Sequence, residues 1–355
     1  MRSFAPLPNV QPALQPGSHL RSGLRSGSAS WVVDVELNHA VFATLLTFAV
    51  ALAHLFGALP PTVELVVLVM AISVFGLPHG ALDYLSGRSL LQGTFGDWWF
   101  VPFGVGYMGL AGLVVATWLV APLPSLLTFL LVSAAHFGAG DVNPRLALGA
   151  GGRFSAHGAV FEAAGRGSLI LIPLLHFHPE AASNLFAHLV PLSPSELYAA
   201  ITAASPHLFV LSGAVLAVVM AHHLGGWAEG TTGHAQVALE IGALAALFAL
   251  APPLVAFIVY FCVWHSFRHS LRQAAKLDPS SPRAALQAFV RRAWPTTAAA
   301  ILMAVVGYAL IGAQSSDVKI IQVVFVGLSA LTAPHIVLSW LASRTASVSA
   351  STNLQ

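Results

Sequence analysis

The stretch VYFCVWHSFRHSLRQ, residues 259–273, places two histidines in a run whose first part is apolar enough for the interior of a lipid bilayer. His265 and His269 are four residues apart, with Arg268 between them. Residues i and i+4 of a helix project from one face, with Cβ atoms about 5–6 Å apart. Both imidazoles can therefore reach one metal ion, and imidazole suits iron, copper, zinc and nickel. The stretch predicts a membrane helix that carries two ligands of a metal site.

The composition of the chain predicts a membrane protein with many spans. Of its 355 residues, 57% are hydrophobic and 8% are charged, whereas a soluble domain usually carries about 25% charged residues. The formal net charge of +2, without a basic patch, argues against nucleic acid as a partner. The single cysteine, Cys262, excludes an internal disulfide and a multi-cysteine metal site. The 16 histidines outnumber the 13 acidic and the 15 basic residues, which is unusual.

The expected fold class is all-α: one polytopic transmembrane helical bundle over residues 35–342. Residues 1–34, rich in Ser, Gly, Pro and Arg, are expected to form a disordered cytoplasmic tail, and residues 343–355 a flexible cytoplasmic tail. The N-terminal segment is not a secretory signal, because the first apolar run begins too late and is long enough to span. An organellar transit peptide would have a similar composition, and the sequence leaves that open.

About ten transmembrane helices are expected, because a span needs roughly 17–25 mostly apolar residues. The seventh is short and could form one kinked unit with the eighth, so the expected range is eight to ten. The approximate ranges are 36–59, 62–85, 98–121, 124–140, 158–178, 205–224, 236–250, 252–275, 289–313 and 318–341.

Positive charge predicts the orientation of these helices. With Arg2, Arg21 and Arg25 in the cytoplasm, nearly all lysines and arginines of the loops fall on the same side. The positive-inside rule then places both termini in the cytoplasm. The expected location is the bacterial inner (cytoplasmic) membrane, with lipid as a partner.

Five histidines then share one membrane depth, in the cytoplasmic halves of four even-numbered helices: His79, His136, His265, His269 and His335. Ionisable groups at such depth are costly and usually functional. Asp83 follows His79 by four residues and Asp141 follows His136 by five, so both are candidates to orient a liganding imidazole. The role of His335 stays open between a ligand, a supporting group and a packed side chain.

Other polar residues have simpler interpretations. A lone membrane histidine more often bonds across helices than binds a metal, which is the expectation for His54 and His207. Arg166 either pairs with Glu162, one turn away, or caps its helix. His222 and His223 are interpreted as a solvated helix end.

Three motifs resemble, in order, those of the Brp/Blh family of membrane-bound β-carotene 15,15′-dioxygenases. They are PHGALDY (78–84), HFGAGD (136–141) and WHSFRHS (264–270); FHPE (177–180) and TAPH (332–335) also resemble family segments. The similarity runs from about residue 45 to 341. It implies a multi-helix membrane enzyme that uses Fe(II) and O₂ to cleave the central 15,15′ double bond of β-carotene, or of a related carotenoid, into two retinal molecules. Carried over motif by motif, the iron ligands and catalytic residues are His79, His136, His265 and His269.

The chain departs from the family pattern at two positions. Tyr84 stands where the family often has a second histidine, and Ala135 where it often has an aromatic residue. Two polar loops, 143–157 and 225–236, also look enlarged. These departures bear on substrate preference, and the sequence does not identify the substrate-binding residues.

The main alternative to an enzyme is a metal or proton transporter that uses the same histidines as a relay. A transporter should have polar groups that continue across the membrane. Here the outer halves of the even-numbered helices are almost wholly apolar, apart from Glu64. A haem-binding subunit would favour histidine pairs set across the membrane, and a single cluster at one depth argues against it.

Overall fold

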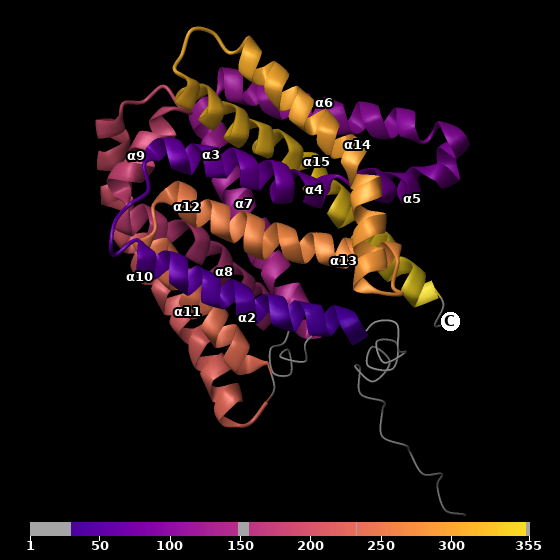
Figure 1. Ribbon diagram of the computed structural model, residues 1–355, viewed down its shortest axis with the longest axis horizontal. Coiled ribbons are helices and arrows are strands. Elements are labelled where there is room, and N and C mark those ends of the chain that lie inside the picture. The colour runs from indigo at the N-terminus through magenta and orange to yellow at the C-terminus, as the bar shows by residue number, and fades with distance from the viewer. Residues whose placement is uncertain (1–29, 148–155, 232, 353–355) are drawn as a thin grey trace, which may run out of the picture.

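The computed structural model describes residues 30–147, 156–231 and 233–352, and in these ranges it is helical, without a β-strand. The helices lie side by side in one bundle (Figure 1). In chain order they are α2 (Ser30–Ala53), α3 (Pro61–Ala71), η1 (Ile72–Gly76), α4 (Leu77–Gly80), α5 (Asp83–Phe95), η2 (Gly96–Trp98), α6 (Phe100–Val120), α7 (Pro122–Ala147), α8 (Ala156–Phe177), α9 (Pro179–Ala187), α10 (Pro194–Ala228), α11 (His234–Leu250), α12 (Pro253–Ile258), η3 (Val259–Ser266), α13 (Phe267–Leu277), α14 (Pro282–Leu310) and α15 (Ser316–Thr352).

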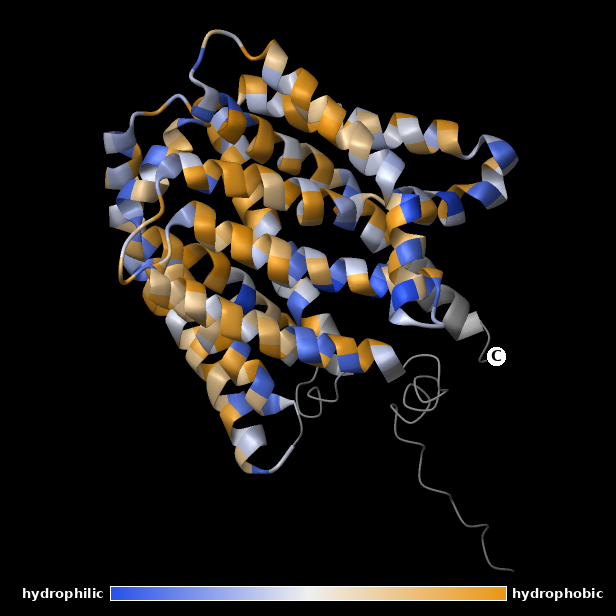
Figure 2. Ribbon diagram, in the orientation of Figure 1, coloured by the Kyte–Doolittle hydropathy of each residue, from blue (hydrophilic) through white to orange (hydrophobic). Residues whose placement is uncertain are grey.

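Nine helices in the described ranges are long and apolar enough to cross a membrane. The helix α11 is apolar but shorter, so the expected eight to ten spans and the all-α bundle are confirmed. Hydrophobic residues cover the middle of the helices, and hydrophilic residues gather toward several of their ends (Figure 2). The start of α2 and the end of α15 lie at the same end of the bundle (Figure 1). The compartment at that end stays a prediction.

Some boundaries differ from the sequence-based ones. Residues 179–204, between the expected fifth and sixth spans, contain α9 and the first turns of α10. Ser193 begins α10 with a capping box: its hydroxyl accepts from the Glu196 amide, and the Glu196 carboxylate accepts from the Ser193 amide.

The two expected tails are described only in part. Residues 1–29 lie outside the described ranges, and α2 begins at Ser30. The helix α15 continues to Thr352, into the stretch expected as a flexible tail, and residues 353–355 lie outside the described ranges. The flexibility and the cytoplasmic location of both tails stay predictions.

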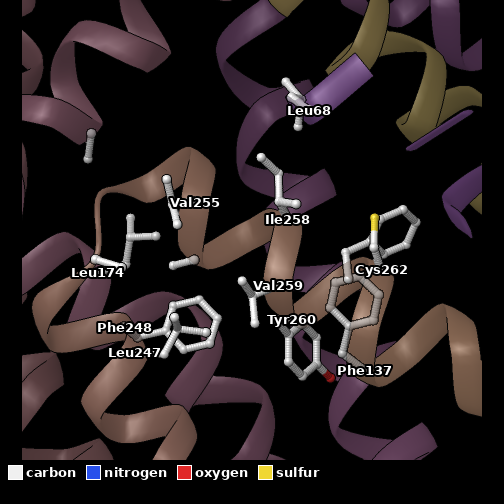
Figure 3. Packing of buried hydrophobic residues seen from close by; sticks show 14 of the residues in the cluster. Leu68, Phe137, Leu174, Leu247, Phe248, Val255, Ile258, Val259, Tyr260 and Cys262 are labelled. Carbon is white, nitrogen blue, oxygen red and sulfur yellow. The ribbon is translucent and has the colours of Figure 1, made fainter. Parts of the chain in front are cut away.

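The helical unit formed by α12, η3 and α13 lies at the centre of the bundle. Of its most apolar window, 61% is buried inside the protein, against 11% for α6 and for α14. Figure 3 shows Tyr260 of η3 between Phe137 of α7 and Phe248 of α11, with Ile258 close to Leu68 of α3. The stretch that carries His265 and His269 therefore lies in the most buried span, against which α2, α3, α7, α11 and α14 pack.

Close contact of α7 with α8 positions the HFGAGD motif. A Cβ atom at Gly138 would lie 2.0 Å from the carbonyl oxygen of Ala163, and one at Gly167 would lie 2.2 Å from that of Ala134. Small residues let membrane helices approach closely, and packing then supplies much of the association energy. Gly138 thus fixes the distance at which α7 presents His136 to the bundle interior.

We expect Gly138→Ala to destabilise the protein, because the added methyl group forces α7 and α8 apart. Overpacking of this kind costs roughly 1–3 kcal/mol. Thermal unfolding in detergent should show a lower midpoint for Gly138→Ala than for Gly112→Ala, since a Cβ at Gly112 meets open space. Equal midpoints for the two variants would show that the α7–α8 contact tolerates separation.

Candidate metal centre

Five imidazoles meet in the bundle interior, contributed by α4, α7, η3, α13 and α15. The His79 ring centroid lies 5.6, 5.7 and 5.2 Å from those of His265, His269 and His335. The His136 centroid lies 5.1 Å from His265 and 5.5 Å from His335. His269 and His335 are 5.3 Å apart. The five histidines that the sequence placed at one depth are therefore brought together, and their role as ligands stays a prediction.

Two π-helical segments position three of these rings. The π-helix η1 ends at Gly76, directly before α4 with His79, and η3 contains His265 and leads into α13 with His269. These two segments pack against each other. π-Helical turns are rare and are frequently found at functional sites. The rings of His265 and His269 are 6.4 Å apart and within 19° of parallel, so both lie on one face as the four-residue spacing predicts.

Several nitrogen atoms of the cluster are available as metal ligands. The Nε2 atoms of His136, His265 and His335 are buried and have no hydrogen-bond partner among the described residues. A buried polar atom without a partner is costly, and a metal ion would offset that cost. The Nδ1 atom of His79 hydrogen-bonds with the carbonyl oxygen of Gly76, which leaves its other nitrogen for a ligand. The chemistry of this donor set fits a transition metal such as iron.

Asp83 orients His335 rather than His79. Its carboxylate accepts a hydrogen bond from His335 Nδ1 at 2.8 Å and another from the Tyr107 hydroxyl at 3.1 Å. With its proton on Nδ1, His335 carries a lone pair on Nε2, beside the rings of His79, His136 and His269. A carboxylate that fixes a metal-binding histidine in this way is a recurrent arrangement. The four-residue spacing from His79 to Asp83 suggested a different partner, because the contact with α15 is not visible in the sequence.

Asp141 belongs to a buried polar network beside the centre. Its Oδ2 atom accepts from the Tyr260 hydroxyl at 3.1 Å and lies 3.8 Å from Arg166 Nη1. Arg166 Nε also lies 3.2 Å from Glu162 Oε1, so of the two alternatives for Arg166 the structure shows the ion pair with Glu162. The orientation of His136 by Asp141 stays a prediction.

Arg268, which lies between the two histidines of the opening motif, points to another helix. Its guanidinium donates to both carboxylate oxygens of Glu240 on α11, at 2.7 and 3.3 Å, and stacks over the Trp264 ring at 4.6 Å. Arg272 bonds Glu36 of α2 at 2.7 Å. The charged side of this helical unit therefore ties it to α11 and α2, while the histidine side faces the centre.

A cavity of about 230 Å³ opens beside His79 and His335. Its walls come from α4, α5, α6, α14 and α15, and apart from a few polar groups near the histidines they are apolar. The residues that line it include Tyr84, Phe103, Met108, Ala300, Met303 and Leu328. Both α6 and α14 pack against α15. Most residues of α6 and α14 are exposed, so this side of the cavity lies at the outer surface of the bundle.

The remaining histidines considered in the sequence lie elsewhere. His54 Nδ1 bonds the carbonyl of Val50, and His207 is exposed on α10. His178 begins α9, and burial lowers its pKa below the usual value. The interpretation of His222 and His223 as a solvated helix end was wrong: His223 is 1% exposed and contacts His234, because α11 folds back onto α10.

Sequence reasoning missed Tyr107, Tyr260 and Gln273, whose polar atoms contact Asp83, Asp141 and His269. Tyr107 and Tyr260 lie in apolar runs and carry no spacing signal. Gln273 follows His269 by four residues, and this helical spacing could have indicated the contact.

Comparison with known proteins identifies the family. The family model described as β-carotene 15,15′-dioxygenase matches residues 70–342, a range that includes all five histidines. The chain belongs to the β-carotene 15,15′-dioxygenase family. This confirms the resemblance drawn from the motifs and the expected class of enzyme, a carotenoid-cleaving dioxygenase.

Several members of this family are similar over most of their length. A probable β-carotene 15,15′-dioxygenase Blh of Halobacterium salinarum is 32% identical over 309 residues, 80% of this chain and 86% of the relative. A β-carotene 15,15′-dioxygenase of the uncultured marine bacterium 66A03 is 28% identical over 278 residues, 76% and 90% of the two chains. A probable β-carotene 15,15′-dioxygenase Brp of Halobacterium salinarum is 27% identical over 248 residues, 68% of each. No solved structure gave a significant match.

The two departures from the family's usual motifs differ in their position. Tyr84 lines the cavity, whereas Ala135 is exposed on α7. Only the substitution at position 84 therefore changes the wall that a ligand in this cavity would contact.

We expect Asp83→Asn to weaken metal binding, because an amide can donate to His335 Nδ1 and so favour the tautomer with a proton on Nε2. Loss of such a supporting carboxylate typically costs about 10–100-fold in metal affinity. Iron retained by the purified protein during dialysis against a chelator measures the effect. The control is Asp97→Asn, on η2. Equal retention in the two variants would show that Asp83 does not support a metal-binding histidine.

Proposed function

We propose that this protein cleaves β-carotene oxidatively at the central 15,15′ double bond and releases two retinal molecules. Iron(II) would be held by His79, His136, His265 and His269. The observation that carries the proposal is the convergence of five imidazoles, of which His265 and His335 are buried, beside an apolar cavity in a member of the β-carotene 15,15′-dioxygenase family. The relatives' names supply the substrate and the position of cleavage.

The fit of the metal rests on the unpartnered nitrogens. The buried Nε2 atoms of His136 and His265 face a group of rings that supplies them with no hydrogen-bond donor. Iron(II), when bound, would supply the activation of O₂. His335 is a candidate fifth contact, because Asp83 fixes its Nδ1 and leaves its buried Nε2 free.

The cavity would bind the hydrocarbon substrate. A long polyene is dissolved in the bilayer and can enter only from the lipid. The apolar side of the cavity, formed by residues of α6 and α14, would be its point of lateral entry. The cavity reaches His79 and His335, so the bond to be cleaved would lie next to the metal-binding rings. The distance from these rings to the far end of the cavity would select the position of cleavage.

Burial serves the chemistry because the reaction needs no proton from the protein. Both oxygen atoms of O₂ end in the two aldehyde groups, and no hydrogen is gained or lost. The site therefore has to exclude water and hold the polyene, rather than supply an acid or a base. Neutral imidazoles suit this role, since a metal-binding histidine must be deprotonated at the liganding nitrogen.

The proposed location is the bacterial inner membrane, with the histidine centre nearer the cytoplasmic side. The excess of lysine and arginine at one side of the bundle supports this orientation.

We expect His265→Ala to abolish carotene cleavage. Cells that make β-carotene and express the wild-type protein should lose their orange colour and accumulate retinal, while cells expressing His265→Ala should keep their carotene. Extraction and liquid chromatography of both pigments provide the measurement. His207→Ala, a change at an exposed histidine of α10, is the matched control and should behave as the wild type.

Carotene retained in wild-type cells, with the protein present in the membrane, would contradict the proposal. A metal-dependent change in proton or metal uptake by the same cells would then favour the transporter.

We expect Ala300→Phe to slow cleavage while iron binding is unchanged, because the aromatic ring would occupy part of the cavity and none of the proposed iron ligands is changed. Displacement of a substrate by about 1 Å can cost about 10²-fold in rate. Retinal formation per bound iron is the quantity to measure. The control is Leu302→Phe, because the Leu302 side chain is 64% exposed on the same helix. If Ala300→Phe kept the wild-type rate, the polyene would have to bind elsewhere.

A further inference from the structure

A second group of histidines lies apart from the centre, where α10 meets α11. His222 and His223 are in the last turns of α10, and His234 is the first residue of α11. One ring nitrogen from each lies within 4.8 Å of the other two. The three ring centroids are 5.1, 5.3 and 4.9 Å apart. The two helices pack side by side, so the group joins residues on either side of a turn.

The group is buried more deeply than a solvated helix end would be. His223 is 1% exposed and His234 is 3% exposed, while His222 is half-buried. An ionised imidazole in such a place would be expensive. The neutral form, in contrast, presents one lone pair for a ligand or a hydrogen bond.

A carboxylate fixes the central histidine of this group. The Nε2 atom of His223 lies 3.3 Å from Oε1 of Glu162 on α8, and that carboxylate also accepts from Arg166. A proton held on Nε2 places the lone pair of His223 on Nδ1, and this atom lies 2.9 Å from Nδ1 of His234. The arrangement repeats the Asp83–His335 pattern of the first centre.

The separation of these nitrogens suits a shared ion. Two imidazole nitrogens bound to one tetrahedral zinc ion at about 2.0–2.1 Å lie roughly 3.3–3.4 Å apart. The His223–His234 nitrogens would need to separate by only about half an ångström to reach that spacing. The third imidazole, His222, completes a three-nitrogen set with one position open.

The backbone beside the group is shaped for the third ring. A Cβ atom at Gly226 would lie 2.7 Å from Cγ and from Nδ1 of His234. Glycine at this position is therefore what allows the imidazole of α11 to pack directly on α10.

We infer that His222, His223 and His234 bind a second divalent transition-metal ion, of the zinc class, which joins α10 to α11 beside Glu162. The site is separate from the five-histidine centre, because its ligands come from different helices. The network of Glu162, Arg166 and Asp141 lies between the two groups. Three nitrogens give no compensating charge, and the neighbouring Glu162 carboxylate offsets part of the charge of the ion. The inference does not depend on the proposed cleavage activity.

Counting bound zinc in four versions of the full-length protein tests the inference. The metal-free protein in detergent is dialysed against a buffer that holds free Zn²⁺ at a low, fixed concentration. Bound zinc per protein is then counted by mass spectrometry. The wild type should bind two equivalents, because zinc also suits the first centre. His234→Ala and His265→Ala should each bind one equivalent, and the double variant should bind none. His207→Ala, on α10, should bind two.

Two results would contradict the inference. If His234→Ala binds as much zinc as the wild type, or if folded His265→Ala binds none, the three histidines are only a hydrogen-bonded group. Gel filtration and helical circular dichroism establish that each variant is folded.

Gly226→Ala keeps the inference testable if His234→Ala does not fold. It retains all three imidazoles but displaces the ring of His234, and it should reduce zinc affinity at this site by about 10–100-fold. Zinc should also raise the unfolding temperature of His265→Ala protein, and should not do so once Gly226→Ala is added. An equal rise in both would overturn the inference.

Discussion

A buried imidazole nitrogen must meet a donor, an acceptor or a metal ion, because lipid and apolar side chains offer none of these. The structure brings five histidines of α4, α7, η3, α13 and α15 to one place, where three Nε2 atoms have no hydrogen-bond partner among the described residues. A bound metal ion would satisfy the constraint there. The remaining architecture supports this convergence. The central helical unit is the most buried span, the glycine contact between α7 and α8 sets the distance of His136, and two π-helical segments direct His79 and His265.

Charged groups obey the same constraint on the other side of the central unit. Arg268 pairs with Glu240 and Arg272 with Glu36, which joins α13 to α11 and α2. A buried pair such as Arg268–Glu240 adds little net stability when compared with apolar packing, but removal of one partner is costly, because it leaves a charge without compensation. The two pairs therefore fix which face of the helix is turned toward the histidine cluster. The Arg268 side chain, which lies between the two histidines in the sequence, pairs with α11.

Most of the bundle could be predicted from the sequence, because a span is a local property: length and apolar composition decide it. The convergence of five histidines also followed from local information, since membrane depth and charge-based orientation place them in one layer.

Contacts between distant segments could not be predicted. Asp83 has a local neighbour in His79 and yet binds His335, and His223 has the appearance of a helix end until α11 folds onto it. The π-helical turns were missed because a regular helical repeat was assumed throughout, and α9 was missed because its polar residues resemble a loop.

X-ray absorption at the iron edge of the purified, iron-loaded protein tests the central claim most directly. If the histidine cluster holds the metal, the nearest neighbours of iron are nitrogen atoms, and the spectrum shows the multiple scattering typical of imidazole rings. His265→Ala protein should bind less iron or show fewer imidazole neighbours. A spectrum dominated by carboxylate oxygen or by sulfur, or one that is the same in the variant, would place the metal elsewhere and contradict the account.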